Sequence, residues 1–200
     1  MRKKEVGPIE KGPAPSLRFL VCDITANVSE LSSSDEQWVS SPIECMDKAV
    51  DRRPRIIVIR FGRMSIRERE TLVELCGALK RNSHTRTCRL LALLRSKHRK
   101  LLEGLNRAGV DFARYVEDVP LDSSEMSGIV DGLGPRDRVE RHLKVVCPFL
   151  HYSEIDSRHE MAVCGAYLDR MALGPSRLHE LCETKDHLQC EYYKKPRPGS

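Results

Sequence analysis

The stretch PRIIVIRF, residues 54–61, decides the fold expected for this 200-residue chain. Its run of Ile and Val is typical of a strand that is buried on both faces of a parallel sheet. Apolar runs of strand length also occur at LRFLVCDI (17–24), RTCRLLALLR (86–95) and DFARYVE (111–117). These runs predict at least four strands, and the short apolar fragment QWVS (37–40) indicates a further one.

Helical periodicity separates the predicted strands. Apolar residues recur at three- and four-residue steps in segments 41–53, 65–82 and 96–110. Ser65 and Glu68 fit a capping box at the start of the second segment, and Gly109 is placed to end the third in the left-handed conformation. Strands that alternate with helices predict an α/β fold with a doubly wound parallel sheet of the flavodoxin type.

The composition of the chain changes after Pro120, where Gly, Ser and Asp become frequent and the sequence allows a short helix. Beyond Arg138 it becomes rich in cysteine and histidine. We therefore expect a small Cys-rich module, mainly helical or irregular, after the sheet domain. The expected parts are a disordered leader (1–16), the α/β domain (17–118), a linker (119–140), the Cys-rich module (141–195) and a tail (196–200).

The composition argues against a dedicated nucleic-acid binder and against a membrane protein. A net charge of +5 allows an acidic partner but does not make the clustered basic surface of a dedicated nucleic-acid binder. Aromatic residues make up 5% of the chain, which is too few for a base-stacking platform. No apolar run is long enough to span a bilayer, and the first residues lack the apolar core of a secretory signal. We expect a cytoplasmic protein without membrane contact, whose eight cysteines are thiols or metal ligands.

Four stretches, taken in order, resemble the receiver domain of bacterial response regulators of the CheY type. They are LRFLVCDI (17–24), PRIIVIRFGRM (54–64), GALKRNSHTRTCRLLALL (77–94) and HRKLLEGLNRAGVDFARYVE (98–117). The resemblance covers residues 17–118, about half of the chain. It implies a site in which Mg²⁺ lies between acidic side chains while an aspartate at the end of the next strand takes a phosphoryl group. A hydroxyl and a lysine complete that site in the family.

The residues at these positions depart from the family pattern. The acidic pair is reduced to Cys22 and Asp23, and the phosphoacceptor position falls on Arg60 or its neighbour Phe61. The hydroxyl position falls near Leu94, and the lysine position falls near Val116 or Glu117. Arginine offers only hydrogen-bond donors, so it can neither accept a phosphoryl group nor bind Mg²⁺. We therefore predict a degenerate phosphorylation pocket made of Cys22, Asp23, Arg60, Leu94 and Glu117, and we expect no enzymatic activity.

Three roles for Arg60 are open from the sequence. Its guanidinium could form an ion pair with Asp23 and lock the pocket, or it could reach from the strand end into solvent. A third role is an anion site built with Arg63 and Arg95, which would need helix N-termini nearby to supply further donors.

Half of the eight cysteines lie in the last third of the chain, at Cys147, Cys164, Cys182 and Cys190. Thiolates are soft ligands, and four of them satisfy either zinc or an iron–sulfur cluster. Because the spacing contains no C-x-x-C knuckle, we favour an iron–sulfur cluster of the [4Fe–4S] type, with zinc as the alternative. His187 either replaces one thiolate on zinc or lies outside the ligand set, facing solvent or supporting a ligand. The other cysteines lie on apolar faces and are predicted to be core residues: Cys22, Cys45, Cys76 and Cys88.

Two charged motifs are assigned no site. RSKHRK (95–100) is predicted to be the solvated start of a helix, and the His–Glu pair in SRHEM (157–161) lacks the second histidine of a metal-binding helix. We expect a bacterial signalling or regulatory module that binds another signalling protein and has the four-cysteine centre as a redox input. A homodimer is compatible with that role. The alternatives are an adaptor with a structural zinc site and a regulator associated with nucleic acid, the latter not favoured.

Overall fold

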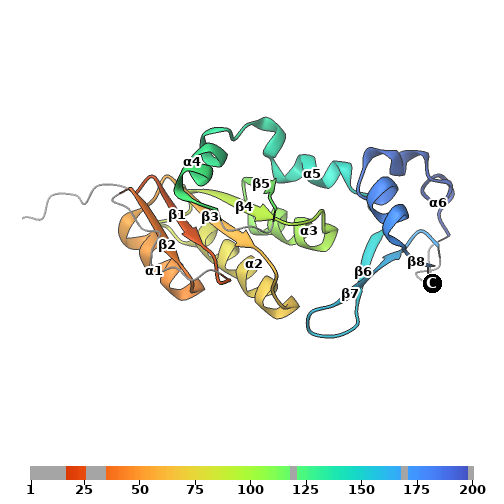
Figure 1. The fold of residues 1–200 in the computed structure, drawn as a ribbon, viewed down its shortest axis with the longest axis horizontal. Helices are drawn as coiled ribbons and strands as arrows, with labels where there is room; N and C mark the ends of the chain where they lie inside the picture. Colours follow the sequence, from red (N-terminus) through yellow and green to blue (C-terminus); the bar gives the residue numbers. More distant parts are fainter. Residues whose placement is uncertain (1–16, 26–34, 118–120, 168–170, 198–200) are drawn as a thin grey trace, which may run out of the picture.

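The computed structural model of the protein describes residues 17–25, 35–117, 121–167 and 171–197. Its larger part is a five-stranded parallel sheet (Figure 1) with the strand order β2-β1-β3-β4-β5. The strands are β1 (Phe19–Cys22), β2 (Glu36–Val39), β3 (Ile56–Phe61), β4 (Arg89–Leu94) and β5 (Phe112–Tyr115). All of the predicted strands are confirmed, including β2 at the fragment around Trp38. The expected leader lies outside the described residues, as do residues 198–200 of the expected tail.

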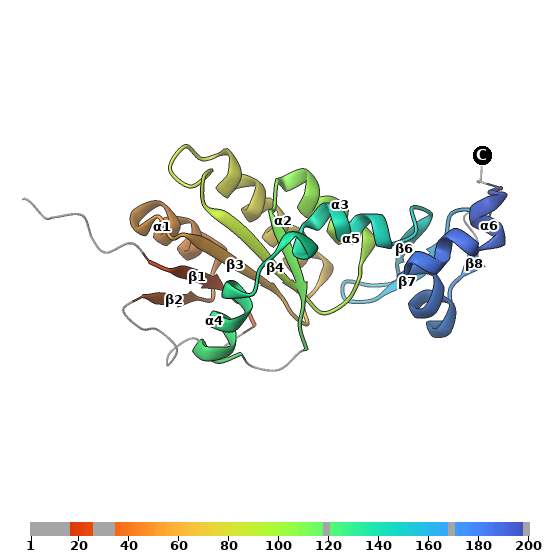
Figure 2. The same cartoon turned by 90° about the horizontal axis from the view of Figure 1, so that it is seen from above.

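Helices cover both faces of this sheet, which confirms the doubly wound α/β fold. One face carries α1 (Pro42–Arg52), α2 (Ile66–Arg81) and α3 (Arg99–Ala108), and the opposite face carries α4 (Ser123–Asp131), as Figures 1 and 2 show. No helix in the described part of the chain is both long and apolar enough to cross a membrane.

Local sequence signals set two of the helix ends as predicted. The Ser65 hydroxyl accepts from the backbone N–H of Glu68, and the Glu68 carboxylate accepts from the backbone N–H of Ser65, which together form the capping box of α2. Gly109 ends α3 in the left-handed conformation, with φ at 80°. These caps give partners to backbone groups that a helix end otherwise leaves unbonded.

The larger apolar core lies between the sheet and the three helices α1, α2 and α3. It joins strand residues such as Ile57 to Leu72 of α2 and Leu102 of α3, all fully buried. The same core contains the cysteines that the sequence predicts to be core residues, namely Cys22, Cys45, Cys76 and Cys88.

The structure differs from the linker expected over residues 119–140. Leu121 and Met126 are buried in a second core on the opposite face of the sheet, so α4 belongs to the sheet domain. Asp122 and Glu125 form a capping box at the start of α4. The short helix that the sequence allows here is therefore present, and burial against the sheet stabilises it.

A smaller unit follows α5 (Val139–Val145), and we call its described residues, 146–167 and 171–197, the C-terminal module (Figure 1). Most of its described residues lie in helical turns or irregular segments, as expected, and it also contains an antiparallel sheet in the order β6-β7-β8, which the sequence does not predict. Its elements are β6 (Leu150–Glu154), β7 (Glu160–Cys164), β8 (Met171–Ala172), a π-helical turn (Arg177–Cys182), a 3-10 turn (Lys185–Gln189) and α6 (Glu191–Lys194).

The strand order of the large sheet determines where a site would lie. In the order 2-1-3-4-5 the connections change direction between β1 and β3, and ligands bind outside the carboxyl ends of the strands at that point. Cys22 at the end of β1 pairs with Ile59 of β3. The next residues along the two strands, Asp23 and Arg60, therefore lie side by side at this edge.

Candidate functional site

A buried ion pair occupies the edge of the sheet between β1 and β3. Nη1 of Arg60 donates to Oδ2 of Asp23 at 2.9 Å, and the two side chains are 8% and 0% exposed. The other carboxylate oxygen of Asp23 accepts from the backbone N–H of Thr25 at 2.9 Å and from its hydroxyl at 2.6 Å. Of the three roles open for Arg60, the structure confirms the ion pair with Asp23.

The other positions of the expected pocket bring no acid or base to this ion pair. Cys22 is buried in the larger core, and Leu94 is buried at the end of β4, where its carbonyl accepts from the backbone N–H of Val116. Phe61, which follows Arg60, is also buried, and Glu117 is exposed. Among the expected pocket positions that the structure describes, the buried carboxylate is that of Asp23, and it is neutralised by a guanidinium.

A cavity of about 270 Å³ opens near this edge at the ends of β3 and β4. Its lining includes Phe61, Arg95 and His98. Neither Arg60 nor Arg63 lines it, so the anion site considered for these two residues with Arg95 is not assembled in this cavity.

The four cysteines of the C-terminal module lie on segments that converge. The backbone N–H of Cys147 donates to the carbonyl oxygen of Cys182 at 2.7 Å. Leu150 donates from its backbone N–H to the carbonyl of Cys147 at 3.2 Å, and it is the cross-strand partner of Cys164. Cys190 precedes α6. Three of the cysteines are buried, and Cys190 is half-buried.

The thiols of these cysteines influence one another. Burial, followed by repulsion from the neighbouring thiolates of Cys147, Cys164 and Cys190, raises the pKa of the Cys182 thiol to about 12. Burial also raises the pKa of Cys147, with smaller contributions in the same direction from Cys164 and Cys190. The structure thus brings the four predicted ligands into one neighbourhood.

Their arrangement is not a closed coordination shell. Within the residues that the structure describes, no group of three or more Cys, His, Asp and Glu side chains could hold a metal ion as placed. The donor type does fit, because four thiolates suit either Zn²⁺ or an iron–sulfur cluster. Binding would require the thiols to lose their protons and the side chains to draw together.

The histidine near the last cysteine is buried rather than solvent-facing. His187 is 3% exposed, and its Nδ1 lies 2.6 Å from the carbonyl oxygen of Thr184. Nδ1 therefore donates to this carbonyl, because a carbonyl oxygen can only accept. The ring packs edge-on against Tyr193 at 5.1 Å between centroids. The other three histidines of the module are exposed: His151, His159 and His179.

A polar cluster joins the C-terminal module to the same edge of the sheet. Oε2 of Glu160 on β7 accepts from Nη1 of Arg69 at 2.6 Å and lies 3.0 Å from Nε2 of His98. The His98 ring stacks on Tyr152 of β6 with 3.6 Å between ring centroids. The module therefore contacts both α2, through Arg69, and the start of α3, through His98.

The hydrogen bonds of His98 require its neutral form. Its Nδ1 accepts from the backbone N–H of Leu101 at 3.2 Å and caps α3, so Nε2 carries the proton and donates to Glu160. Burial, and then the positive charge of Arg69, lowers the pKa of His98 to about 4. Burial alone would raise the pKa of Glu160, but hydrogen bonds from Arg69 and His98 lower it below its ordinary value.

Two further hydrogen bonds tie the cysteine segments to the start of α3. Nη1 of Arg99 donates to the carbonyl of Val146 at 2.8 Å, and Nζ of Lys97 donates to the carbonyl of Glu183 at 3.1 Å. Both carbonyls belong to residues adjacent to a cysteine of the converging set. A rearrangement of those cysteines would therefore change the hydrogen bonds of Lys97 and Arg99 at the start of α3.

Sequence reasoning missed this contact between module and sheet. RSKHRK (95–100) is predicted to be a solvated helix start, whereas the side chains of His98 and Arg99 are 12% and 15% exposed. Glu160 lies in the SRHEM motif, to which the sequence assigns no site, and its side chain is 8% exposed. The one local signal is a histidine placed immediately before a helix, where it can act as an N-cap.

Comparisons with known proteins find a likeness among solved structures. No protein-family model matches the chain, and no curated protein matches it. A crystal structure of a response regulator from Desulfuromonas acetoxidans matches with a TM-score of 0.41 and 19% sequence identity, covering 57% of this chain and 94% of that chain. This likeness is remote, and the description of the fold rests on the strand order of the chain itself.

Arg60→Met should lower the free energy of unfolding by about 3–5 kcal/mol, because it leaves the buried Asp23 carboxylate without its counter-charge. Chemical denaturation measures the change. Adding Asp23→Asn removes the stranded charge and keeps an acceptor for Thr25, so the double variant should recover much of the loss. Arg67→Met, at an exposed position of α2, is the control and should change stability by less than about 0.5 kcal/mol. A double variant no more stable than Arg60→Met would contradict this account of the ion pair.

Acidification should weaken the contact between the module and the sheet. The unfolded chain takes up a proton on His98 near pH 6.5, whereas the folded chain resists until about pH 4, so stability falls as the pH drops through this window. The loss assigned to His98 is at most about 3 kcal/mol. Glu160, whose pKa is lowered in the fold, adds a loss of the same sign.

The pH dependence is tested by His98→Asn, which keeps an acceptor for the capped N–H of Leu101 but cannot take up a proton. The difference in unfolding free energy between about pH 7.5 and about pH 4.5 should be smaller in this variant than in the wild type. His151→Asn, at an exposed histidine of β6, is the matched control. An equal pH dependence in His98→Asn and the wild type would show that His98 does not carry the effect.

Proposed function

We propose that the protein is a non-enzymatic signalling module, a receiver-like domain that takes no phosphoryl group and acts by binding another signalling protein. The buried ion pair between Arg60 and Asp23 carries this proposal. It lies between β1 and β3, where sheets with this strand order bind their ligands. A charge pair in that position fills the place where the chemistry of a receiver would occur.

The ion pair opposes phosphoryl transfer in two ways. Transfer to a protein needs Mg²⁺ held by acidic oxygens and an ionised carboxylate that acts as the nucleophile. Both oxygens of Asp23 are engaged, one by Arg60 and the other by Thr25, and Phe61 offers no nucleophile. A divalent cation would also meet the guanidinium charge, and moving Arg60 aside would leave a buried carboxylate unpaired.

The full chain, incubated with acetyl phosphate and Mg²⁺, should gain no phosphoryl group, because the carboxylate described at the edge between β1 and β3, that of Asp23, is paired with Arg60. Intact-protein mass spectrometry measures the added mass, and an active receiver domain treated in parallel is the positive control. Phosphorylation of an aspartate of the wild-type chain would overturn the proposal.

A second part of the proposal concerns the input to this module. We infer that the four cysteines of the C-terminal module bind a metal centre, an iron–sulfur cluster or, as the alternative, zinc. The support is the convergence of four cysteines from separate turns and strands, namely Cys147, Cys164, Cys182 and Cys190. A bound centre would cross-link these segments and stabilise the module, and a cluster would in addition respond to oxidants.

The start of α3 is the route by which a change in the module would reach the sheet domain. Lys97 and Arg99 hold carbonyls next to the cysteines, and His98 is held by Glu160 of β7. Loss of the metal centre would free the cysteine segments and with them these three contacts. The redox role therefore predicts that the module and α3 change together.

Protein purified without oxygen should contain either zinc or equal amounts of iron and sulfide, and metal and sulfide assays distinguish the two. Cys182→Ser combined with Cys190→Ser should lose the metal, because it removes half of the thiolates. Cys88→Ala is the matched control, since it removes a cysteine of the sheet core and should leave the metal content unchanged. Metal-free wild-type protein, or metal retained by the double variant, would refute the four-cysteine centre. If the protein contains zinc and does not respond to oxidant, the alternative holds, which is an adaptor with a structural zinc site.

A further inference from the structure

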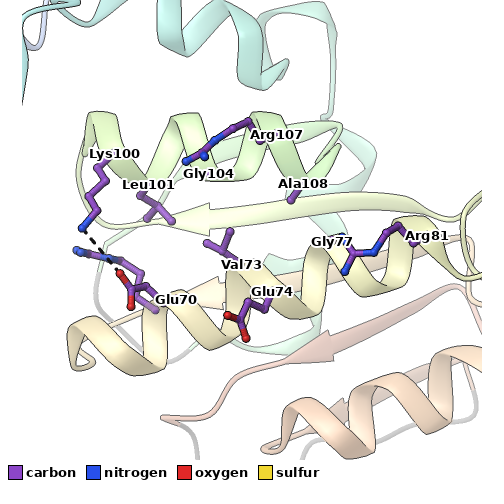
Figure 3. A pocket seen from close by; sticks show the side chains of 11 residues that line it. Glu70, Val73, Glu74, Gly77, Arg81, Lys100, Leu101, Gly104, Arg107 and Ala108 are labelled. Carbon is purple, nitrogen blue, oxygen red and sulfur yellow. Dashed lines mark ion pairs between the residues drawn. The ribbon is translucent and has the colours of Figure 1, made fainter.

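A groove of about 480 Å³ runs between α2 and α3, and we call it the α2–α3 groove (Figure 3). Its floor is apolar, with Val73 of α2 and Leu101 of α3 pointing toward each other in Figure 3. Gly77 and Gly104 leave it open because they contribute no side chains. The helices approach closely here, since a Cβ added to Gly104 would lie 3.3 Å from a methyl group of Val73.

At one end of the α2–α3 groove the charges are satisfied within the chain. Nζ of Lys100 lies 3.8 Å from Glu70, an ion pair drawn in Figure 3, and 3.4 Å from Glu154 of β6. Arg69 is held by Glu160 at 2.6 Å. This end of the groove therefore has little attraction for further charge.

The other end of the groove is positively charged. Arg81 of α2 and Arg107 of α3 are both exposed, and in Figure 3 each side chain bends back over its own helix toward the glycine of the groove. Nε of Arg107 donates only to the backbone carbonyl of Glu103, at a long 3.4 Å. Among the residues that the structure describes, neither guanidinium has a carboxylate partner.

We propose that the α2–α3 groove is the docking surface for an acidic amphipathic helix of a partner protein. The lining spans Arg69 to Arg81 on α2, which corresponds to a groove about 18 Å long at the rise of an α-helix. That length fits about three turns of a partner helix, whose apolar residues would contact the floor between Val73 and Leu101. Carboxylates at one end of that helix would pair with Arg81 and Arg107.

Glu74 gives the docked helix a direction. It lines the α2 side of the groove between the two charged ends. A carboxylate of the partner would be repelled there and attracted at the Arg81–Arg107 end, so only one orientation matches the charges. This inference rests on the proposed signalling role only for the existence of a protein partner, and it is independent of the metal centre and of the absence of phosphorylation.

The test uses a synthetic helical peptide with leucines at helical spacing on one face and two glutamates at one end. Fluorescence anisotropy with the full chain should show saturable binding. The double variant R81E/R107E should bind the peptide at least about tenfold more weakly, because attraction is replaced by like-charge repulsion. A second peptide, with lysines in place of the two glutamates, should bind this variant better than the wild type. R67E/R86E, at two exposed arginines outside the groove, is the matched control and should bind like the wild type.

Three outcomes would overturn this assignment. They are no saturable binding to the wild type, equal binding to R81E/R107E, and loss of binding equally in the control R67E/R86E. Sedimentation of the wild type tests whether a second copy of the chain occupies the groove. A dimer that R81E/R107E abolishes would assign the groove to a second copy of the chain instead of an acidic partner. Acyl phosphate formation would refute the proposed function without altering any of these binding results.

Discussion

The ion pair between Asp23 and Arg60 is the interaction on which the behaviour of the sheet domain depends. Removing two charges from water costs much of what their attraction returns, so such a pair adds little net stability. Separating the two side chains is nevertheless costly in free energy, because either partner alone would be a buried, uncompensated charge. Two further hydrogen bonds from Thr25 fix the Asp23 carboxylate in position beside Arg60. The edge of the sheet therefore has one favourable state, whereas phosphoryl chemistry needs a site that accepts and releases charge.

Most of the sheet domain is predictable because its signals are local. The apolar run at 54–61 indicates a strand covered on both faces, and the capping pair of Ser65 and Glu68 and the cap at Gly109 mark helix ends within a few residues. The ion pair itself stays one of three options from the sequence. Whether Arg60 meets Asp23 depends on the strand order, which places β1 next to β3 and which no local pattern contains.

The features that the sequence does not reveal are those made by distant residues. Met126 of α4 is buried only because the opposite face of the sheet is there to receive it. His98 and Glu160 lie 62 positions apart, and each belongs to a charged motif that resembles ordinary surface. The cysteines are a middle case: their clustering in the sequence predicts that they gather, but not the backbone contacts that bring Cys147 to Cys182. Whether a charged side chain is buried depends on the assembled fold. From composition alone, a charged residue is expected to be exposed to solvent.

Helix α3 is the element that the C-terminal module and the α2–α3 groove share. Its ten residues are too few to be stable alone in water, so its position is set by packing at both ends. His98 and Arg99 contact the module at its start, and Gly104 and Arg107 line the groove farther along. A helix of this length moves as a rigid unit, so a displacement at its start is carried to the groove. Under the proposed function, a change in the module would alter the affinity of the α2–α3 groove for its partner, and this output would require no phosphoryl group.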